Sequence, residues 1–95
     1  MDVAVSGIAA DSLGARRIGS IAWEVSQRLV TDALLLDDGA IRTAQRWLWQ
    51  TLRVMVEPAA ALGVAALLTG VVRPVAGERV ALILCGANLD PATLA

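Results

Sequence analysis

Lysine, histidine and cysteine are missing or scarce in this 95-residue sequence, and each absence excludes a kind of chemistry. No lysine occurs, so no side chain of the chain can form a Schiff base with an aldehyde. No histidine occurs, which excludes a nucleophile activated by an imidazole. Cysteine occurs once, at Cys85, so neither an intramolecular disulfide nor a Cys/His metal site can form.

Positive charge is carried by arginine alone. The eight arginines are scattered and the formal net charge is -1. Binding to nucleic acid needs basic residues gathered on one surface, and no such patch is visible. We therefore expect no nucleic-acid partner.

Apolar residues, by contrast, are abundant. They make up 57% of the chain, and the mean hydropathy of +0.65 is high for a small free-standing domain, which has a large surface to cover with polar groups. The chain is therefore either membrane-spanning or part of something larger. The longest weakly polar run, residues 59–72, is shorter than the roughly 18–20 residues that a span needs. With no basic segment at Met1-Asp2-Val3 to suggest a signal peptide, we expect a cytoplasmic protein that makes no membrane contact.

Helical periodicity is clearest in the middle of the chain. A helix is predicted over residues 40–56, capped by Asp37 or Asp38, because apolar residues recur at helical spacing. They are Ile41, Ala44, Leu48, Leu52 and Met55. An earlier amphipathic helix is predicted over residues 19–29.

Two further helices are predicted towards the C-terminus. One begins at Pro58 and ends before Gly70, and its interior is apolar on nearly every face, as in a helix surrounded by protein. The last begins at Asp90-Pro91 and runs to Ala95.

Two short apolar segments favour strands. Residues 31–36 are short and apolar, bounded by Asp32 and by Asp37-Asp38, and residues 80–84 form a continuous apolar run of the kind found in a buried parallel strand. The predicted order is loop, helix, strand, helix, helix, strand, helix. The predicted fold class is therefore α/β, a partial segment of a three-layer sheet that has too few strands to stand alone.

Ligands of open α/β sheets bind beyond the carboxyl ends of the strands. The turn Cys85-Gly86-Ala87-Asn88 follows the predicted strand 80–84 and is therefore a candidate binding site. Gly86 permits close approach of the backbone to a ligand, and Cys85 offers a weak donor and acceptor. Cys85 could equally be a small buried residue. Glu57 is either a helix-terminal carboxylate or a site residue. Asp11 and Ser12 are either ligand contacts or ordinary loop residues.

Several of these segments together resemble one family. Residues 56–70, which begin Val-Glu-Pro-Ala-Ala-Ala-Leu-Gly, look like the segment after the long helix of threonine/serine dehydratases and serine racemases. Cys85-Gly86-Ala87-Asn88-Leu89-Asp90 is similar to the family's Ser/Cys-Gly-Gly-Asn-x-Asp turn, and Ala10-Asp11-Ser12 resembles its Ala-Asp-Gly loop. The resemblance covers residues 4–95, and it implies a tryptophan-synthase-β-like enzyme that uses pyridoxal 5'-phosphate.

The resemblance implies roles for four residues. Cys85 would face the pyridine nitrogen of the cofactor, where a neutral thiol leaves the ring a moderate electron sink suited to loss of water from a hydroxy amino acid. Gly86 would lie against the ring, Glu57 would lie near the same site, and Asn88 would belong to the same cofactor-binding turn. The sequence departs from the family pattern at Ala87 and Ser12, which add side chains near the expected pocket.

The resemblance also implies what this chain does not contain. The family's Schiff-base lysine, its glycine-rich phosphate loop and its metal ligands all lie upstream of the matched segment. Residues 1–95 are thus expected to be the C-terminal part of a dehydratase catalytic domain that converts threonine or serine to a 2-oxo acid and ammonia, and to be inactive alone. The alternatives are a serine racemase segment and a non-catalytic α/β interaction module that associates with itself or with an upstream half.

Overall fold

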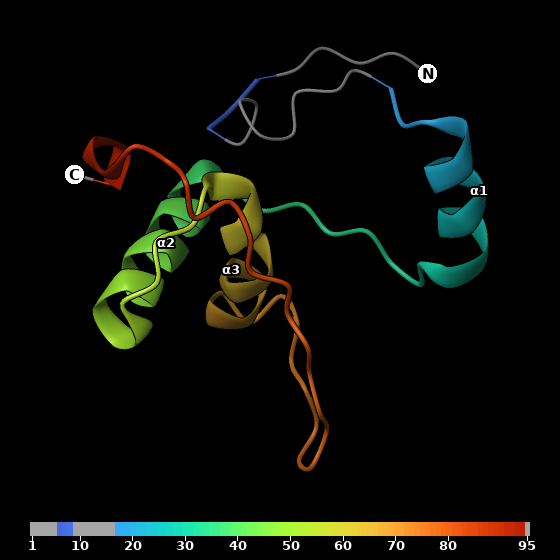
Figure 1. The fold of residues 1–95 in the computed structure, drawn as a ribbon. Helices are drawn as coiled ribbons and strands as arrows, with labels where there is room; N and C mark the ends of the chain where they lie inside the picture. Colours follow the sequence, from blue (N-terminus) through green and yellow to red (C-terminus); the bar gives the residue numbers. More distant parts are fainter. Residues whose placement is uncertain (1–5, 9–16, 95) are drawn as a thin grey trace.

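The computed structural model describes residues 6–8 and 17–94, and every regular element in this part of the chain is helical (Figure 1). The elements are α1 (Ser20–Leu29), α2 (Asp38–Leu52), the 3-10 helix η1 (Pro58–Ala61), α3 (Leu62–Leu68) and the 3-10 helix η2 (Pro91–Leu94). The radius of gyration is 14.3 Å, whereas a compact domain of this length has about 12 Å. The chain is therefore only partly compact.

The longest helix, α2, has defined signals at both ends. At its start the side chain of Asp37 accepts a hydrogen bond from the backbone N–H of Ala40, at 2.7 Å, as predicted for an N-cap. At its end Arg53 adopts a left-handed conformation, with φ 56° and ψ 36°, and its N–H donates to the carbonyl of Trp49. This backbone reversal ends the helix at Leu52, four residues before the predicted end at Val56.

The core lies where α2 packs against η1 and α3, and these three elements are called the helical unit here. Three of the five residues predicted to share one face of α2 are buried in this core, whereas Leu52 is exposed and Met55 lies beyond the helix end. The buried apolar residues are Ile41, Ala44, Leu48, Val56, Ala60, Ala61, Val64 and Ala65. Alanines supply half of them, so helix axes can approach closely but little apolar area is buried.

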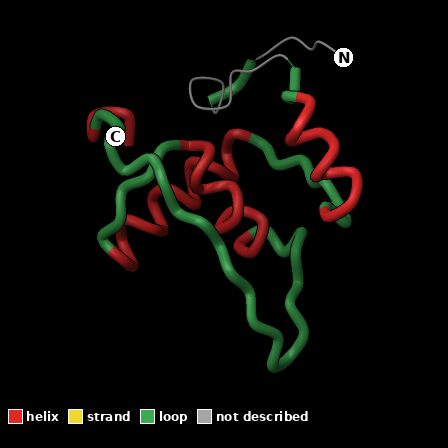
Figure 2. Tube along the Cα trace, turned by 45° about the vertical axis from the view of Figure 1, so that its right-hand side comes forward, coloured by secondary structure: helices red, strands yellow, loops and turns green. Residues whose placement is uncertain are grey.

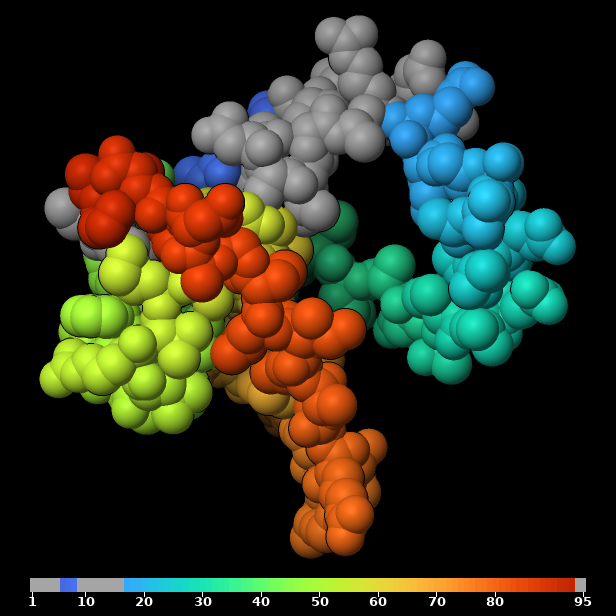
Figure 3. Space-filling view, viewed as in Figure 1, coloured from blue at the N-terminus to red at the C-terminus, as the bar shows by residue number. Residues whose placement is uncertain are grey.

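Helix α1 stands apart from the helical unit (Figure 3). The helix predicted at residues 19–29 is confirmed, but none of its residues is buried and it contacts no other described element. Ile21 and Leu29, on its apolar face, are 81% and 73% exposed. No helix among the described residues is long and apolar enough to cross a membrane.

The predicted α/β fold class is wrong for the described part of the chain. Residues 31–36 are the extended link between α1 and α2, residues 80–84 are extended and exposed, and neither segment is a strand (Figure 2). A strand requires a neighbour that satisfies its backbone N–H and C=O groups. These two segments do not pair with each other, so the predicted three-layer sheet segment does not form.

Residues 71–85 form a projecting arm that leaves the end of α3, turns, and comes back to the helical unit (Figure 1). The arm touches α3 through Leu82, whose side chain occupies the space beside Gly63 that a Cβ there would need. Its other apolar residues are largely exposed, with Ile83 at 89%. The arm ends at Cys85, next to the start of η1.

Candidate functional site

Glu57 and Gly86 meet where the arm returns to the helical unit. The backbone N–H of Glu57 donates to the carbonyl of Gly86 at 2.9 Å. Gly86 has φ +66°, and a Cβ built on it would collide with the side chain of Glu57. Only glycine satisfies both conditions without strain, so the close approach expected of Gly86 is made to Glu57.

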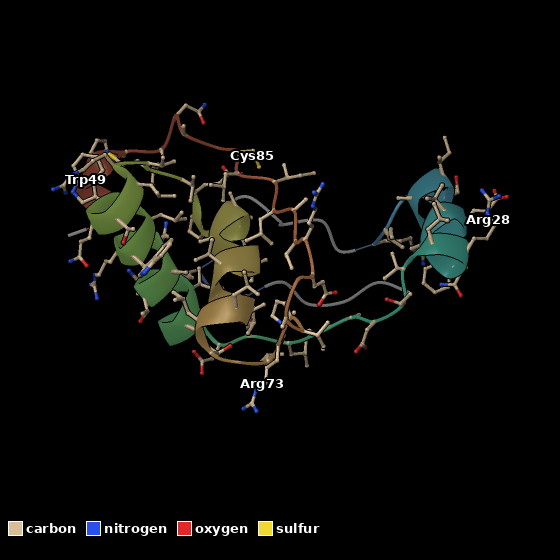
Figure 4. All side chains as sticks on the ribbon, turned by 90° about the horizontal axis from the view of Figure 1, so that it is seen from below. Arg28, Trp49, Arg73 and Cys85 are labelled. Atoms are coloured by element: carbon tan, nitrogen blue, oxygen red, sulfur yellow. The ribbon has the colours of Figure 1, made fainter. Side chains whose placement is uncertain are left out.

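Cys85 lies immediately before this junction, at the end of the projecting arm (Figure 4). Its side chain is exposed and free. The interpretation of Cys85 as a buried small apolar residue is therefore wrong for this chain. The thiol is open to a ligand or to another polypeptide, one residue from the contact between Gly86 and Glu57.

The other candidate site residues predicted from the sequence do not take part in the contact between Glu57 and Gly86. Asn88 is exposed in the turn that follows Gly86, and no hydrogen bond joins it to Glu57 or to any other residue of the described part. Glu57 itself is partly buried. The structure therefore brings Glu57 and Gly86 together, with Cys85 adjacent and Asn88 apart. Asp11 and Ser12 lie outside the described residues.

A pocket of about 400 Å³ lies beside Glu57. Its polar lining residues are Arg42, Gln45, Glu57, Asp90 and Thr93. Its apolar lining residues are Ile8, Pro58 and Leu89. Cys85 does not line it, whereas Leu89 and Asp90, which directly follow the thiol-bearing turn, do.

Three local structures shape this pocket. The N–H of Ile8 donates to the Asp38 carboxylate at 3.2 Å, which holds Ile8 against the first turn of α2. The Asp90 carboxylate accepts from the N–H of Ala92 at 3.0 Å and caps η2, and the Thr93 hydroxyl donates to the Asp90 carbonyl at 2.7 Å. The contact of Ile8 with Asp38 and the packing of η2 against α2 bring residues from both ends of the described chain to α2.

Gln45 is a site residue that the sequence reading missed. It is 4% exposed, and its Nε2 donates to the carbonyl of Val56 at 3.0 Å, which fixes the backbone just before Glu57. The signal available in the sequence was a polar residue between Ala44 and Leu48, on the edge of the buried stripe of α2. A polar residue at such a position needs a buried partner, and here the partner is the chain segment that carries Glu57.

Metal binding has no support in the described residues, among which no group of three or more Cys, Asp or Glu side chains is arranged to hold an ion.

Comparison with known proteins identifies the family to which the chain belongs. Residues 2–86 match the family model described as "Pyridoxal-phosphate dependent enzyme". The match covers most of the chain, and the chain belongs to this family. The family resemblance expected from the sequence is therefore confirmed, and pyridoxal phosphate is the cofactor of the full-length members. No solved structure matches the chain.

Several relatives of the chain are named as dehydratases or racemases of amino acids. A phenylserine dehydratase of Ralstonia pickettii is 40% identical over 86 residues, which are 90% of this chain and 26% of that protein. A biosynthetic L-threonine dehydratase of Haemophilus influenzae is 34% identical over 98% of this chain and 18% of that protein. A serine racemase of Oryza sativa is 34% identical over 77% of this chain and 23% of that protein. The chain thus spans about a quarter or less of the length of these relatives.

The residues present fit one edge of the cofactor and not its covalent attachment. The exposed thiol of Cys85 is open to the edge of a flat pyridine ring, whereas the space left by the missing side chain of Gly86 is filled by Glu57. A covalent link to the cofactor aldehyde needs a primary amine on a side chain, and the sequence has no lysine. This chain could therefore contribute only a wall of a pyridoxal-phosphate pocket.

Proposed function

We propose that this chain is the C-terminal part of the catalytic domain of a pyridoxal-phosphate-dependent amino-acid lyase. The net reaction is loss of ammonia from a hydroxy amino acid, giving 2-oxobutanoate from L-threonine or pyruvate from L-serine. Water is eliminated first, and one water is consumed again when the resulting imine is hydrolysed to the 2-oxo acid and ammonia. Support comes from the family and from relatives named as dehydratases of threonine and of phenylserine. The cytoplasmic location expected from the sequence remains a prediction.

The observation that carries the proposal is the junction of Glu57 and Gly86, which holds the exposed Cys85 thiol where the arm rejoins the helical unit. Bound pyridoxal phosphate supplies the electron sink of the reaction. In the proposal, Cys85 faces the ring nitrogen and, as a neutral group, does not hold a proton on it as a carboxylate would. Glu57 fixes the position of Gly86, and in the proposal Gly86 presents to the ring the side of its backbone that Glu57 does not cover.

The proposed activity requires a second polypeptide segment that carries a lysine. The chain alone is expected to be inactive, because nothing in it can hold the cofactor covalently. A serine racemase function shares every one of these features, and the choice between the two reactions depends on substrate-binding residues outside this chain.

A non-catalytic interaction module is the second candidate function. It is favoured by one observation, the exposed apolar side chains of α1 and of the projecting arm. In that case the chain would associate with itself, and its association would not depend on pyridoxal phosphate.

The test is to express this chain together with the Ralstonia phenylserine dehydratase truncated just before the segment that this chain matches. Release of 2-oxo acid from threonine, serine and phenylserine is measured, with each polypeptide alone as the control. We expect activity only from the pair. Release of 2-oxo acid by the chain alone would overturn the proposal, and a chain that forms oligomers alone but never joins its complement would favour the interaction module.

Variants of Cys85 in the active pair test the role of the thiol. Cys85→Ser keeps a neutral hydrogen-bonding group and should retain activity within about tenfold, since one neutral hydrogen bond is worth about 1 kcal/mol. Cys85→Asp would keep the ring nitrogen protonated and should lower lyase activity by more than Cys85→Ser does, with a changed cofactor absorbance spectrum. Equal activity and spectra for the two variants would remove Cys85 from the cofactor site.

A further inference from the structure

The pocket beside Glu57 is lined by charged residues of both signs. Arg42 lies on α2 one turn before Gln45, whereas Glu57 precedes η1 and Asp90 caps η2. Residues from three separate elements therefore converge on one space of about 400 Å³, which falls within the range of about 300–1,000 Å³ usual for small-molecule sites.

The charged side chains of this pocket are not neutralised by one another. Within the described part of the chain, the side chains of Arg42 and Glu57 make no hydrogen bond or ion pair. One oxygen of the Asp90 carboxylate accepts from Ala92, and the other is left for a ligand. One cation and two carboxylates are thus available to groups that enter the pocket.

Gln45 adds a neutral acceptor to the pocket. Its Nε2 is used by the Val56 carbonyl, whereas its Oε1 accepts no hydrogen bond from the described residues. No fully enclosed side-chain nitrogen or oxygen in the described chain lacks a partner, so this oxygen must reach solvent although Gln45 is only 4% exposed. Gln45 is one of the residues that line the pocket. A buried amide oxygen held in this way is a ready acceptor for an N–H or O–H of a ligand.

We propose that this pocket binds a small α-amino acid in its zwitterionic form. Arg42 binds the carboxylate, for which a guanidinium provides paired donors. Glu57 and Asp90 bind the ammonium group, and the Gln45 oxygen accepts one of its protons. The ligand side chain lies against Ile8 and Leu89.

This site goes beyond the proposed lyase function and needs neither lysine nor cofactor. It shares Glu57 with the proposed cofactor wall but not Cys85. A probe that lacks a β-hydroxyl group cannot undergo the proposed elimination, so binding of such a probe to the chain alone tests the pocket separately. If the pair of polypeptides shows no lyase activity but the probe binds to the chain, the proposed lyase function is overturned and the pocket proposal stands. If the pair is an active lyase but the probe does not bind, the pocket proposal is overturned and the lyase function stands.

The experiment is a titration of the full 95-residue chain, followed by two-dimensional NMR of its amide groups. The probes are L-norleucine, L-norleucinamide, which lacks the carboxylate, and hexanoate, which lacks the ammonium group. We expect norleucine to shift the Gln45 side-chain amide and backbone signals around Glu57 and Asp90, and to bind at least tenfold more tightly than either analogue. Equal binding of the amide or of hexanoate would contradict the zwitterion, and absence of these shifts up to about 50 mM norleucine would exclude the site.

A matched pair of variants assigns the carboxylate contact. Arg42→Gln should weaken norleucine binding at least tenfold and leave the weak binding of norleucinamide unchanged. Arg46→Gln is the control, because Arg46 is also exposed on α2, one turn further along, and does not line the pocket. It should bind norleucine within twofold of the unmodified chain. Wild-type affinity in Arg42→Gln with a preserved spectrum would overturn the assignment.

Discussion

The helical unit and the projecting arm are both rich in apolar residues, but the helical unit buries them and the arm leaves most of them exposed. In the helical unit, Leu48 and Val56 are each 1% exposed and are enclosed by α2, η1 and α3. In the arm, Ile83 is 89% exposed, and Leu82, which packs beside Gly63, is still 39% exposed. Helix α1 resembles the arm in this respect, since its apolar face is covered by nothing described.

The difference follows from where each element finds its hydrogen-bond partners. A helix satisfies its backbone within itself, and two helices joined by a short link bury a shared stripe at once. An extended segment has its backbone partners on another strand, and the described chain provides none for residues 80–84. The helical unit is therefore expected to carry the stability of the chain, and the arm to contribute almost none.

Core truncation should give the largest effect. Leu48→Ala should lower the free energy of unfolding by about 2–5 kcal/mol, because a fully buried leucine is replaced by a cavity. For so small a core this is enough to unfold the chain. Urea denaturation followed by circular dichroism measures it, with Leu52→Ala as the control, since Leu52 is 53% exposed. Equal losses in the two variants would show that α2 does not pack as described.

The second-largest loss of stability is expected at the junction of Glu57 and Gly86. Gly86→Ala should cost about 2–3 kcal/mol, because a Cβ both disfavours the positive φ and collides with Glu57. Gly77→Ala is the matched control: Gly77 has φ +82° with nothing within 4 Å of the added Cβ, so only the conformational cost of about 1–2 kcal/mol applies. The same denaturation curves measure both variants. Identical costs would mean that Gly86 and Glu57 are not in contact.

Loss of the α2 cap should be smaller. Asp37→Ala removes the acceptor for the Ala40 N–H and should cost about 1 kcal/mol. Asp32→Ala removes only a contact with the adjacent Ala33 N–H, outside any helix, and should be close to neutral. The midpoint of urea unfolding is compared between them, and a larger shift for Asp32→Ala would contradict the assigned start of α2.

The arm should give the smallest effect on stability. Ile83→Ser should change the free energy of unfolding by no more than about 0.5 kcal/mol, as for an ordinary surface site. The same substitution should reduce binding of a hydrophobic dye, because it removes exposed apolar area. A destabilisation comparable with that of Leu48→Ala would show that the arm is packed in solution.

The features that were predicted from sequence are those encoded within a few residues. Asp37 as a cap, Pro58 at a helix start and Gly70 after a helix end all act locally, and the structure confirms each one. For Gly86 the sequence predicted close approach to a ligand, which stays a prediction, and the close neighbour that the structure describes is Glu57. The family resemblance was confirmed because its motifs are also local.

The features that were not predicted depend on distant parts of the chain. An apolar run such as residues 80–84 is compatible with a strand, but only a neighbour decides whether one forms. The early end of α2 depends on Arg53 in a left-handed conformation, which the sequence does not signal, since glycine or asparagine is usual there. The pocket needed Ile8, Gln45 and Asp90 to converge, and no spacing in the sequence brings them together.

Hydrogen exchange of the backbone amides, measured on the full chain, tests the contrast between the helical unit and the arm most directly. Amides of α2 and α3 should exchange slowly and together, at the rate set by unfolding of the helical unit, whereas amides of residues 79–84 should exchange as fast as in an unfolded peptide. Protection of residues 79–84 equal to that of α2 would contradict this account, because it would require backbone partners that the described chain does not supply.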